Sequence, residues 1–482
     1  PTNIRVGDNV LTNPTYVNEV ANNDNCFAFN EMFPGGFTPK FGGTIKDFSI
    51  AAGIKGETDL LVEDLSYDIS FYKGENEVDF FIRNTINPSL GPNTPNEFKP
   101  GKYIQSEQSI NLDVSKFMEL SGDKDLNIAG GIEFRDESYE SIAGDSKSWE
   151  VGPLASQGFG IGSNGFPGLP DRAAGKAERD SMALYIDLES HVSDNLMISG
   201  AIRYEDFSDF GDTTKGKIAF RYQLDDDWAL RGAYSTGFKA PTIGQSNVRN
   251  VTTAFGTDGK LIDRATLPPT DPIATYKGGT VLTPEESESI SFGIVGEFEN
   301  GLFLTADFYQ IDISDRIATV SGISLSEADI AALEAAGNPD ASSFSEISYF
   351  TNDFDTTTTG LDLVANYEMD MWGGETRYSF AFNWTETEVT DVNSFVNGDG
   401  DMVTNISDER IRMLEENLPN IRYSFTASHT NEGWKAMARL NYFGDIYEDH
   451  LDSGLPIEDI SAEFTVDAEV GYSFTDNLEL VL

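Results

Sequence analysis

The segment LMISGAIRYE, residues 196–205, alternates apolar and polar side chains at every second position. Leu196, Ile198, Ile202 and Tyr204 fall on one side of an extended chain, whereas Arg203 falls on the other. This period of two predicts a β-strand with one apolar and one polar face. The segment spans ten residues, longer than the usual strand of a soluble sheet. Ten residues is also the length with which a tilted strand crosses a bilayer.

The same alternation recurs along the chain and predicts an all-β fold. It is found in the segments 217–224, 228–235, 289–299 and 302–308. Short polar turns alternate with mostly longer connections. The short turns are Ser193–Asn195, Asp225–Asp227, Glu299–Gly301, Asp370–Gly374, Thr430–Gly433 and Thr475–Asn477. The longer connections are Ser138–Lys176, Lys239–Thr283, Ala318–Ser345, Asp391–Leu418 and Gly444–Glu458. Short turns on one side and long loops on the other are typical of bacterial outer-membrane barrels.

This alternation also sets the expected domain organisation. The stretch Leu61–Ile86 would break it if the stretch were divided into two strands at Gly74. We therefore interpret the stretch as one strand, bulged near Gly74, that rises above the membrane. Residues 46–482 are then an incomplete, large antiparallel transmembrane β-barrel with long extracellular loops. It has about sixteen strands, against the roughly 22 of a plugged transporter. Residues 1–45 are expected to form an extracellular segment that leads into the barrel.

The composition excludes several classes of function. Lys and Arg total 32 and Asp and Glu total 81, a net charge of −49, so the chain repels nucleic acid. Cys26 is the single cysteine, and His191, His429 and His450 share no ligand spacing, which argues against a metal centre. The sequence shows no catalytic constellation, so we expect neither an enzyme nor a cofactor. No apolar run approaches about 18 residues, which excludes transmembrane helices but not a barrel.

The acidic residues are densest in the loops and turns, and two explanations remain open. A saline habitat would screen their mutual repulsion, and we favour this explanation. A vestibule that attracts cations is the functional alternative.

One stretch carries a family resemblance. RGAYSTGFKAPT, residues 231–242, resembles the barrel of TonB-dependent outer-membrane receptors. Four further stretches resemble the same family in the same order: RYEDFSDFGDTTKGKIAFRY (203–222), LTPEESESISFG (282–293), FLTADFYQIDISDRI (303–317) and TTTGLDLVANY (357–367). The resemblance implies energy-coupled uptake of a scarce nutrient (a siderophore, haem, cobalamin or a carbohydrate) through the Gram-negative outer membrane. A passive porin and a surface adhesin are the alternatives.

The resemblance also implies partners and missing parts. The implied partners are the TonB energy-transducing complex, outer-membrane lipid and lipopolysaccharide, and the nutrient ligand. Members of the family begin with a signal peptide, a TonB-contacting box and a plug domain, and they end in closing strands. Neither region is present between Pro1 and Leu482. We therefore expect this chain to be an internal piece of a longer polypeptide, with the plug outside it.

The residues that carry the resemblance are interpreted as structural. We expect Gly237 to allow a kink, Phe238 to lie at the membrane interface and Pro241 to end strand pairing. The full set is Arg231, Gly232, Thr236, Gly237, Phe238, Ala240, Pro241 and Thr242.

Three arginines are the candidates for a functional site. Arg203, Arg221 and Arg231 occupy the polar faces of consecutive strands, so we expect them to face the lumen together. There they would bind an anionic ligand or the plug. The alternative, which we favour, is that they pair with Glu205 and other lumen carboxylates. The side chains expected to face lipid are Ile218, Phe220, Tyr222, Leu230, Ile290 and Phe292.

Two loop segments complete the candidates. The stretch NGDGD, residues 397–401, resembles half of a calcium loop, with Asp399 and Asp401 as possible ligands. The bidentate glutamate expected further on is absent, so a solvated acidic loop is favoured. Residues 326–336 predict a short loop helix that Ser326 and Asp329 cap and Gly337 ends.

Overall fold

A computed structural model gives the architecture. It describes residues 4–6, 9–11, 15, 18–19, 22–23 and 27–482, apart from 61, 121–123, 158, 256–260, 321, 397–401, 405, 450–457 and 476. Within these residues, no helix is both long and apolar enough to span a membrane.

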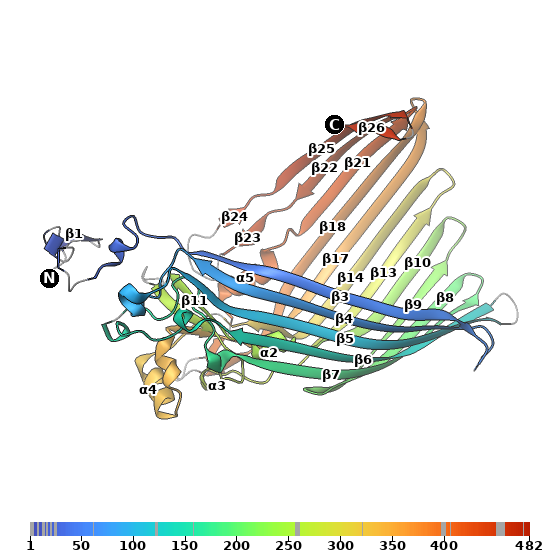
Figure 1. Cartoon of the computed structure of the whole chain (residues 1–482). Coiled ribbons are helices and arrows are strands. Elements are labelled where there is room, and N and C mark those ends of the chain that lie inside the picture. Colours follow the sequence, from blue (N-terminus) through green and yellow to red (C-terminus); the bar gives the residue numbers. More distant parts are fainter. Residues whose placement is uncertain are drawn as a thin grey trace.

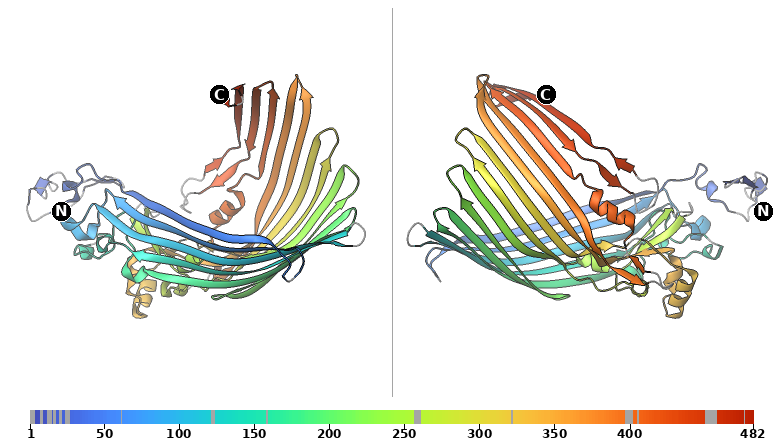
Figure 2. Two further views of the ribbon diagram at one scale, coloured as in Figure 1. Left: turned by 45° about the vertical axis from the view of Figure 1, so that its right-hand side comes forward. Right: turned by 180° about the vertical axis from the view of Figure 1, so that it is seen from behind.

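One curved antiparallel sheet of sixteen strands forms most of the molecule. Its strands are β3 (Lys40–Thr58), β4 (Leu65–Arg83), β5 (Glu97–Leu120), β6 (Lys124–Ala143), β7 (Gly175–Ser193), β8 (Leu196–Phe207), β9 (Gly211–Gln223), β10 (Trp228–Lys239), β13 (Glu285–Glu297), β14 (Leu302–Thr319), β17 (Phe350–Met371), β18 (Gly374–Val392), β21 (Ile421–Asn431), β22 (Trp434–Phe443), β25 (Glu463–Thr475) and β26 (Leu478–Val481). Each strand pairs with the next of this set, and β3 and β26 lie at the two edges. The predicted fold class and strand number are confirmed. Figure 2 shows the sheet as an open trough.

The connections sort to the two ends of the strands as expected. Because neighbouring strands are antiparallel, alternate connections lie at the same end. We call the end with the short hairpins the turn rim and the other end the loop rim (Figure 1). The connections 144–174, 240–284, 320–349, 393–420 and 444–462 all lie at the loop rim.

Some strand boundaries differ from those expected. β3 begins at Lys40, so the sheet starts before residue 46. β6 continues to Ala143, which shortens the connection expected from Ser138. Leu65–Arg83 is one strand, as expected, but its pairing with β3 runs unbroken past Gly74. The irregularity lies between Phe80 and Ile82 instead. The prediction of a bulge near Gly74 is therefore wrong.

The outer face of the sheet carries a band of exposed apolar side chains. Ile218, Phe220, Tyr222, Ile290 and Phe292 are all exposed, and the register places Leu230 on the same face, opposite Tyr222. Along β13 and the residue that follows it, Ile290, Phe292, Ile294 and Phe298 lie on this face, and they span about 26 Å at about 3.3 Å per residue. At a tilt of about 40° this length covers about 20 Å of bilayer depth, which falls within the roughly 25 Å apolar band of outer-membrane barrels.

Aromatic residues mark the turn-rim boundary of this band. Trp228 packs edge-on against Phe298 with ring centroids 5.1 Å apart, and Trp434 contacts Tyr472 at 4.7 Å. Trp372, the third tryptophan at this end, is 73% exposed. Indole and phenol rings favour the membrane–water interface because one end is apolar and the other polar.

Two connections at the loop rim fold together into a compact unit that we call the cap. β11 (Asn250–Phe255), β12 (Leu261–Thr266) and α3 (Pro272–Tyr276) come from connection 240–284. β15 (Ile323–Ser324), α4 (Glu327–Ala335), η6 (Pro339–Ser343) and β16 (Glu346–Ser348) come from connection 320–349. The strands form one sheet, β11-β12-β16-β15. Buried Leu267, Leu333, Ile347 and Tyr349 are among the residues of its core. The helix expected at 326–336 is confirmed as α4, with Ser326 as its N-cap.

The remaining elements are short and lie outside the main sheet. They are β1 (Ile4–Val6), β2 (Asn9–Leu11), η1 (Phe29–Glu31), η2 (Pro88–Asn93), η3 (Ser146–Ser148), η4 (Ala155–Gln157), η5 (Asp171–Ala173), α2 (Ile243–Asn247), β19 (Ser394–Val396), β20 (Met402–Thr404), α5 (Asp408–Glu416), β23 (Ile446–Glu448) and β24 (Glu458–Ile460).

Candidate functional site on the inner wall and at the mouth

The inner face of the sheet carries the polar side chains that alternate with the outer band. Arg221 and Arg231 are direct cross-strand partners on β9 and β10. Arg221 is also opposite Met197 on β8, which lies on the same face of that strand as Arg203. The three arginines therefore lie on one face.

Arg203 and Arg231 are both held by carboxylates. The Arg203 guanidinium donates to Glu133 and Glu205, each at 2.9 Å. Arg231 donates two bonds to Asp307, Nε to Oδ1 at 2.7 Å and Nη2 to Oδ2 at 2.6 Å. A fork that meets a carboxylate with two bonds fixes the orientation of both groups. These contacts match the pairing alternative of the sequence analysis, and any ligand-binding role stays a prediction.

A glycine makes the Arg231–Asp307 contact possible. Gly293 on β13 stands between them, opposite Arg231 on one side and Asp307 on the other. A Cβ at Gly293 would lie 2.0 Å from Asp307 Oδ1. Arg231 therefore reaches across an intervening strand through the space that the missing side chain leaves.

The same arrangement recurs on the other side of the wall. Tyr185 on β7 donates its hydroxyl to Asp113 Oδ1 on β5 at 2.6 Å, across Gly131 on β6. A Cβ at Gly131 would lie 2.5 Å from that same oxygen. Glycines of the inner face thus allow polar contacts between strands that are not neighbours, which ties the wall together.

Arg221 differs from the other two arginines. Its guanidinium makes no ion pair with any residue that the structure describes, and the side chain is exposed. Like charges directly opposite one another in a sheet repel. Arg231 turns toward Asp307, which lessens its repulsion of Arg221. Arg221 therefore stays on the inner face, where its charge is available to a further partner.

The family-like residues 231–242 mostly make packing contacts. The ring of Phe220 lies over Gly232, and Thr236 Oγ1 accepts a bond from Gly216 N at 3.0 Å. Gly237 pairs with Ser287 inside a continuous ladder, so the kink expected at Gly237 is not present. A Cβ there would lie 2.7 Å from Ser287 Oγ, which gives a steric reason for the glycine.

The end of this motif is tied to other strands at the loop rim. Phe238 packs edge-on against Phe207 at 5.8 Å. The β10 ladder stops at Lys239, so pairing ends just before Ala240 and Pro241, as expected. Thr242 is the N-cap of α2.

A buried arginine that the sequence analysis missed holds Pro241. Arg179 on β7 is 3% exposed, and its Nη2 donates to the Pro241 carbonyl at 2.7 Å. Its guanidinium also donates to both carboxylate oxygens of Asp209, at 2.6–3.0 Å. Asp209 lies in the tight connection between β8 and β9, within the family-like stretch 203–222, but nothing in that stretch indicates Arg179 as its partner. Only the three-dimensional arrangement reveals this contact.

The mouth of the barrel is lined by aromatic rings on the side of β3–β6. Phe41 lies 4.3 Å from the ring of Phe166, and Phe80 lies 5.3 Å from Tyr103. Tyr103 in turn lies 5.7 Å from Tyr139. Contacts of this kind stabilise a wall, and exposed rings offer a flat surface to a ligand. Phe41 is 49% exposed.

Ion pairs join the two connections that form the cap. In the cap, Arg264 pairs with Glu346 at 2.9 Å and Lys277 with Asp329 at 2.8 Å, each joining the two connections. Burial would raise the pKa of Asp329, but the bonds from Lys277 and Ser326 outweigh it and lower this pKa to about 2.

Connection 84–96 is joined in a similar way to connection 144–174. The fully buried Asn87 side chain donates from Nδ2 to the carbonyls of Lys147 and Glu150, both at 3.0 Å. Its Oδ1 accepts from the backbone and the side chain of Ser89.

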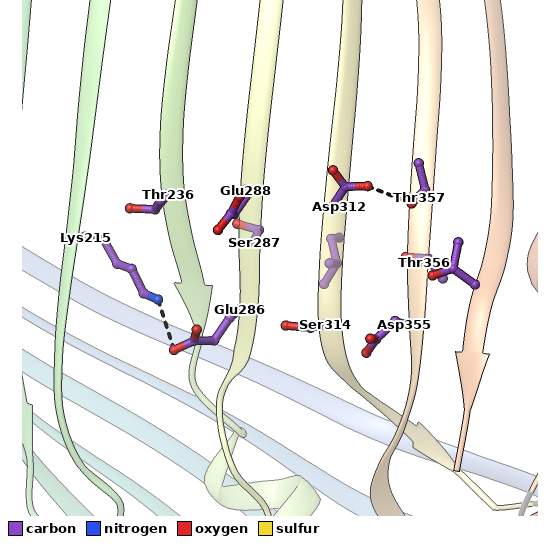
Figure 3. Close-up of a pocket in the computed structure, with 12 residues that line it drawn as sticks. Lys215, Thr236, Glu286, Ser287, Glu288, Asp312, Ser314, Asp355, Thr356 and Thr357 are labelled. Atoms are coloured by element: carbon purple, nitrogen blue, oxygen red, sulfur yellow. Dashed lines mark hydrogen bonds and ion pairs between the residues drawn. The ribbon is translucent and has the colours of Figure 1, made fainter.

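A groove of about 290 Å³ lies on the outer wall, on the loop-rim side of the apolar band (Figure 3). Glu288 and Asp312 are cross-strand partners on the face that carries Ile290 and Phe292. Lys215 pairs with Glu286 at 3.0 Å, and Thr357 donates to Asp312 at 2.6 Å. This groove is acidic and faces away from the inner wall.

The calcium candidates Asp399 and Asp401 lie outside the described residues, as do Cys26 and His450. Among the residues that are described, no three His, Cys, Asp or Glu side chains gather as metal ligands.

Comparison with known proteins identifies the fold. A family model for the β-barrel of TonB-dependent receptor-like proteins matches residues 2–482. The ferric enterobactin receptor PirA of Pseudomonas aeruginosa is 32% identical over 95 residues, which are 19% of this chain and 12% of that protein.

Solved structures resemble the chain over most of its length. The siderophore receptor PirA of Acinetobacter baumannii has a TM-score of 0.57 at 14% identity, covering 90% of this chain and 57% of its own. The outer-membrane transporter YddB of Escherichia coli has a TM-score of 0.58 at 10% identity, covering 91% of this chain and 58% of its own. The chain thus spans little more than half the length of these relatives. Since the family model covers nearly every residue, the chain belongs to the TonB-dependent receptor-like β-barrel family.

Proposed function

We propose that this chain forms the barrel wall of a receptor that takes up a scarce nutrient through the outer membrane of a Gram-negative bacterium, driven by TonB. The observation that carries the proposal is the match of the family model to residues 2–482. The geometry supports it, because an apolar outer band faces away from a polar inner wall with long connections at one rim. The chain would act as a transporter and not as an enzyme.

The proposal includes a set of partners. The outer band would contact lipid and the acidic outer groove would lie at the level of lipopolysaccharide. The inner wall would surround a plug domain, and the TonB complex would act through that region. Arg221 is the inner-wall residue that we assign to contact an anionic group of the plug or of the ligand, because its charge is available.

The ligand belongs to the nutrient class that such receptors import, and a siderophore is the first candidate to test. One relative is named as a ferric enterobactin receptor and another as a siderophore receptor. Haem, cobalamin and carbohydrate complete the set to be screened.

Growth of a deletion strain tests the proposal. The gene is deleted in its host. Growth is then measured in media in which iron, cobalamin or a carbohydrate is limiting, and the limiting nutrient is supplied in each medium as a single defined complex. We expect a growth defect on one source that the full-length gene restores and that a tonB deletion reproduces. Uptake that persists without TonB would indicate a passive porin instead. Normal growth on every source, together with lost attachment to surfaces, would indicate an adhesin.

Protease treatment of intact cells tests the orientation. Cleavage is expected in connections 144–174 and 240–284, whereas the turn Asp225–Asp227 should be spared. Cleavage at that turn in sealed cells would invert the proposed topology.

A further inference from the structure

The segment that follows β10 crosses back over the inner wall. We call residues 241–249 the strap. Arg179 on β7 binds the strap at Pro241, and Tyr103 on β5 binds it at Arg249, donating its hydroxyl to the Arg249 carbonyl at 3.1 Å. Between these anchors, α2 packs against β6 and β7. The strap therefore spans three strands of the wall that are remote in sequence from β10.

The first anchor is held in place independently of the strap. The Arg179 guanidinium lies next to the stacked rings of Phe207 and Phe210, at 5.8 and 5.3 Å from their centroids, and it meets Asp209 with two nitrogens. A buried cation with a carboxylate partner and aromatic neighbours has little freedom to reorient. The bond to the Pro241 carbonyl is thus made by a donor that is already positioned.

The second anchor keeps its proton. Tyr103 lies on β5 well beyond the apolar band, and burial raises the pKa of its phenol to about 12. The hydroxyl therefore remains a donor at every physiological pH. Arg249 is bonded in turn to Asp271 at the start of α3, which joins this end of the strap to the cap.

The strap is also ordered within itself. Thr242 and Gln245 form a reciprocal capping box, with bonds of 2.9 and 3.0 Å between each side chain and the other backbone amide. Ile243 is 8% exposed, because it lies on the buried side of the strap. Thr242 and Asn247 are exposed, and the charged Arg249 of the strap is paired with Asp271, so the uncovered side presents neutral hydroxyl and amide groups.

We propose that Arg179 is a positioning residue that holds residues 241–249 as a fixed strap across the inner wall, and that the strap forms a neutral, hydrogen-bonding lining of the mouth. The position of the strap does not depend on the proposed function. Only its effect on an incoming nutrient, which would pass the strap, rests on that function. A lining of this kind suits ligands that carry hydroxyl or amide groups, because it offers donors and acceptors without net charge.

Cysteine labelling tests the anchor without any ligand. In a full-length Cys26→Ser background, Ile243→Cys reports on the buried side of the strap, and Ala274→Cys, which is fully buried in the cap, is the matched control. A membrane-impermeant maleimide is applied to whole cells, and the labelling rates are compared with and without Arg179→Met. We expect Arg179→Met to raise the rate at Ile243→Cys by about tenfold or more, which corresponds to a loss of about 1.4 kcal/mol, and to leave the rate at Ala274→Cys unchanged.

Two further variants keep the test decisive. Arg179→Lys retains the charge and should raise the rate at Ile243→Cys less than Arg179→Met does. Asp209→Asn changes an exposed partner, and it serves if Arg179→Met fails to assemble. Unchanged labelling at Ile243→Cys in all three variants would overturn the proposal. Equal increases at both reporter positions would also overturn it, because they would show general loosening of the mouth. Since no ligand is used, these results do not depend on whether nutrient uptake is found.

Discussion

Replacing Gly293 with alanine should destabilise the wall through the Arg231–Asp307 pair. The new Cβ would lie 2.0 Å from Asp307 Oδ1 and 3.2 Å from the Ala306 carbonyl oxygen, so the carboxylate must move. The pair is partly exposed, with side-chain exposures of 48% and 24%, which limits its contribution to about 0.2–1 kcal/mol. A freed Arg231 would also face Arg221, and like charges directly opposite cost a further 0.2–1 kcal/mol or so.

We therefore expect Gly293→Ala to lower the free energy of unfolding by about 1 kcal/mol. The assay is urea unfolding of the full-length receptor in lipid vesicles, followed by tryptophan fluorescence. Gly200→Ala on β8 is the matched control, because its nearest contact would be 3.6 Å away and the lower chain entropy of alanine favours folding. In an Asp307→Ala background, where the space is free, the cost of Gly293→Ala should disappear. Equal effects of Gly293→Ala in both backgrounds would refute the reasoning.

Three other perturbations have calculable outcomes. The pKa of Asp329 falls from 3.8 to about 2 on folding, so its charged form adds about 2 kcal/mol to the stability of the cap. This stabilisation is present above pH 4 and is lost as the pH falls through 2. Hydrogen exchange of the cap should show this pH dependence, and Asp329→Asn should abolish the pH dependence. Asn87→Ala leaves the carbonyls of Lys147 and Glu150, both in connection 144–174, without this donor and should cost about 1–3 kcal/mol, seen as faster proteolysis within 144–174; equal proteolysis of both proteins would contradict this. Phe292→Arg puts a charge on the outer band at about 2–4 kcal/mol and should reduce assembly in vesicles, whereas Ser291→Arg on the inner face should not.

The strand framework was predictable because its cause is local. A period of two in segments such as 196–205 places every side chain on one of two faces, and connection lengths then set the order of strands. The pairing of Arg203 and Arg231 with carboxylates followed from that placement. The error at Gly74 has a local cause too. The Tyr72 hydroxyl lies 2.4 Å from where a Cβ would be, so the glycine makes room for a ring and does not mark a bulge.

The arrangement at the mouth could not be read from the chain, because it depends on contacts between distant connections. β12 pairs in parallel with β16, which joins Arg264 to Glu346 across two strands of the main sheet. Arg179 binds Pro241 from three strands away. Nothing in the alternation of either strand indicates such a contact, since alternation reports only on which face a side chain lies.

The most direct test of the account is whether consecutive residues of β13 alternate between lipid and water. Single spin labels are placed at Ser289, Ile290, Ser291 and Phe292 of the full-length receptor in lipid vesicles. Collision rates are then measured with oxygen, which dissolves in lipid, and with a water-soluble nickel chelate. Labels at Ile290 and Phe292 should meet oxygen more often, and labels at Ser289 and Ser291 should meet less of it. Collision rates with no period of two, or with the opposite phase, would contradict both the assignment of the inner wall and the membrane barrel.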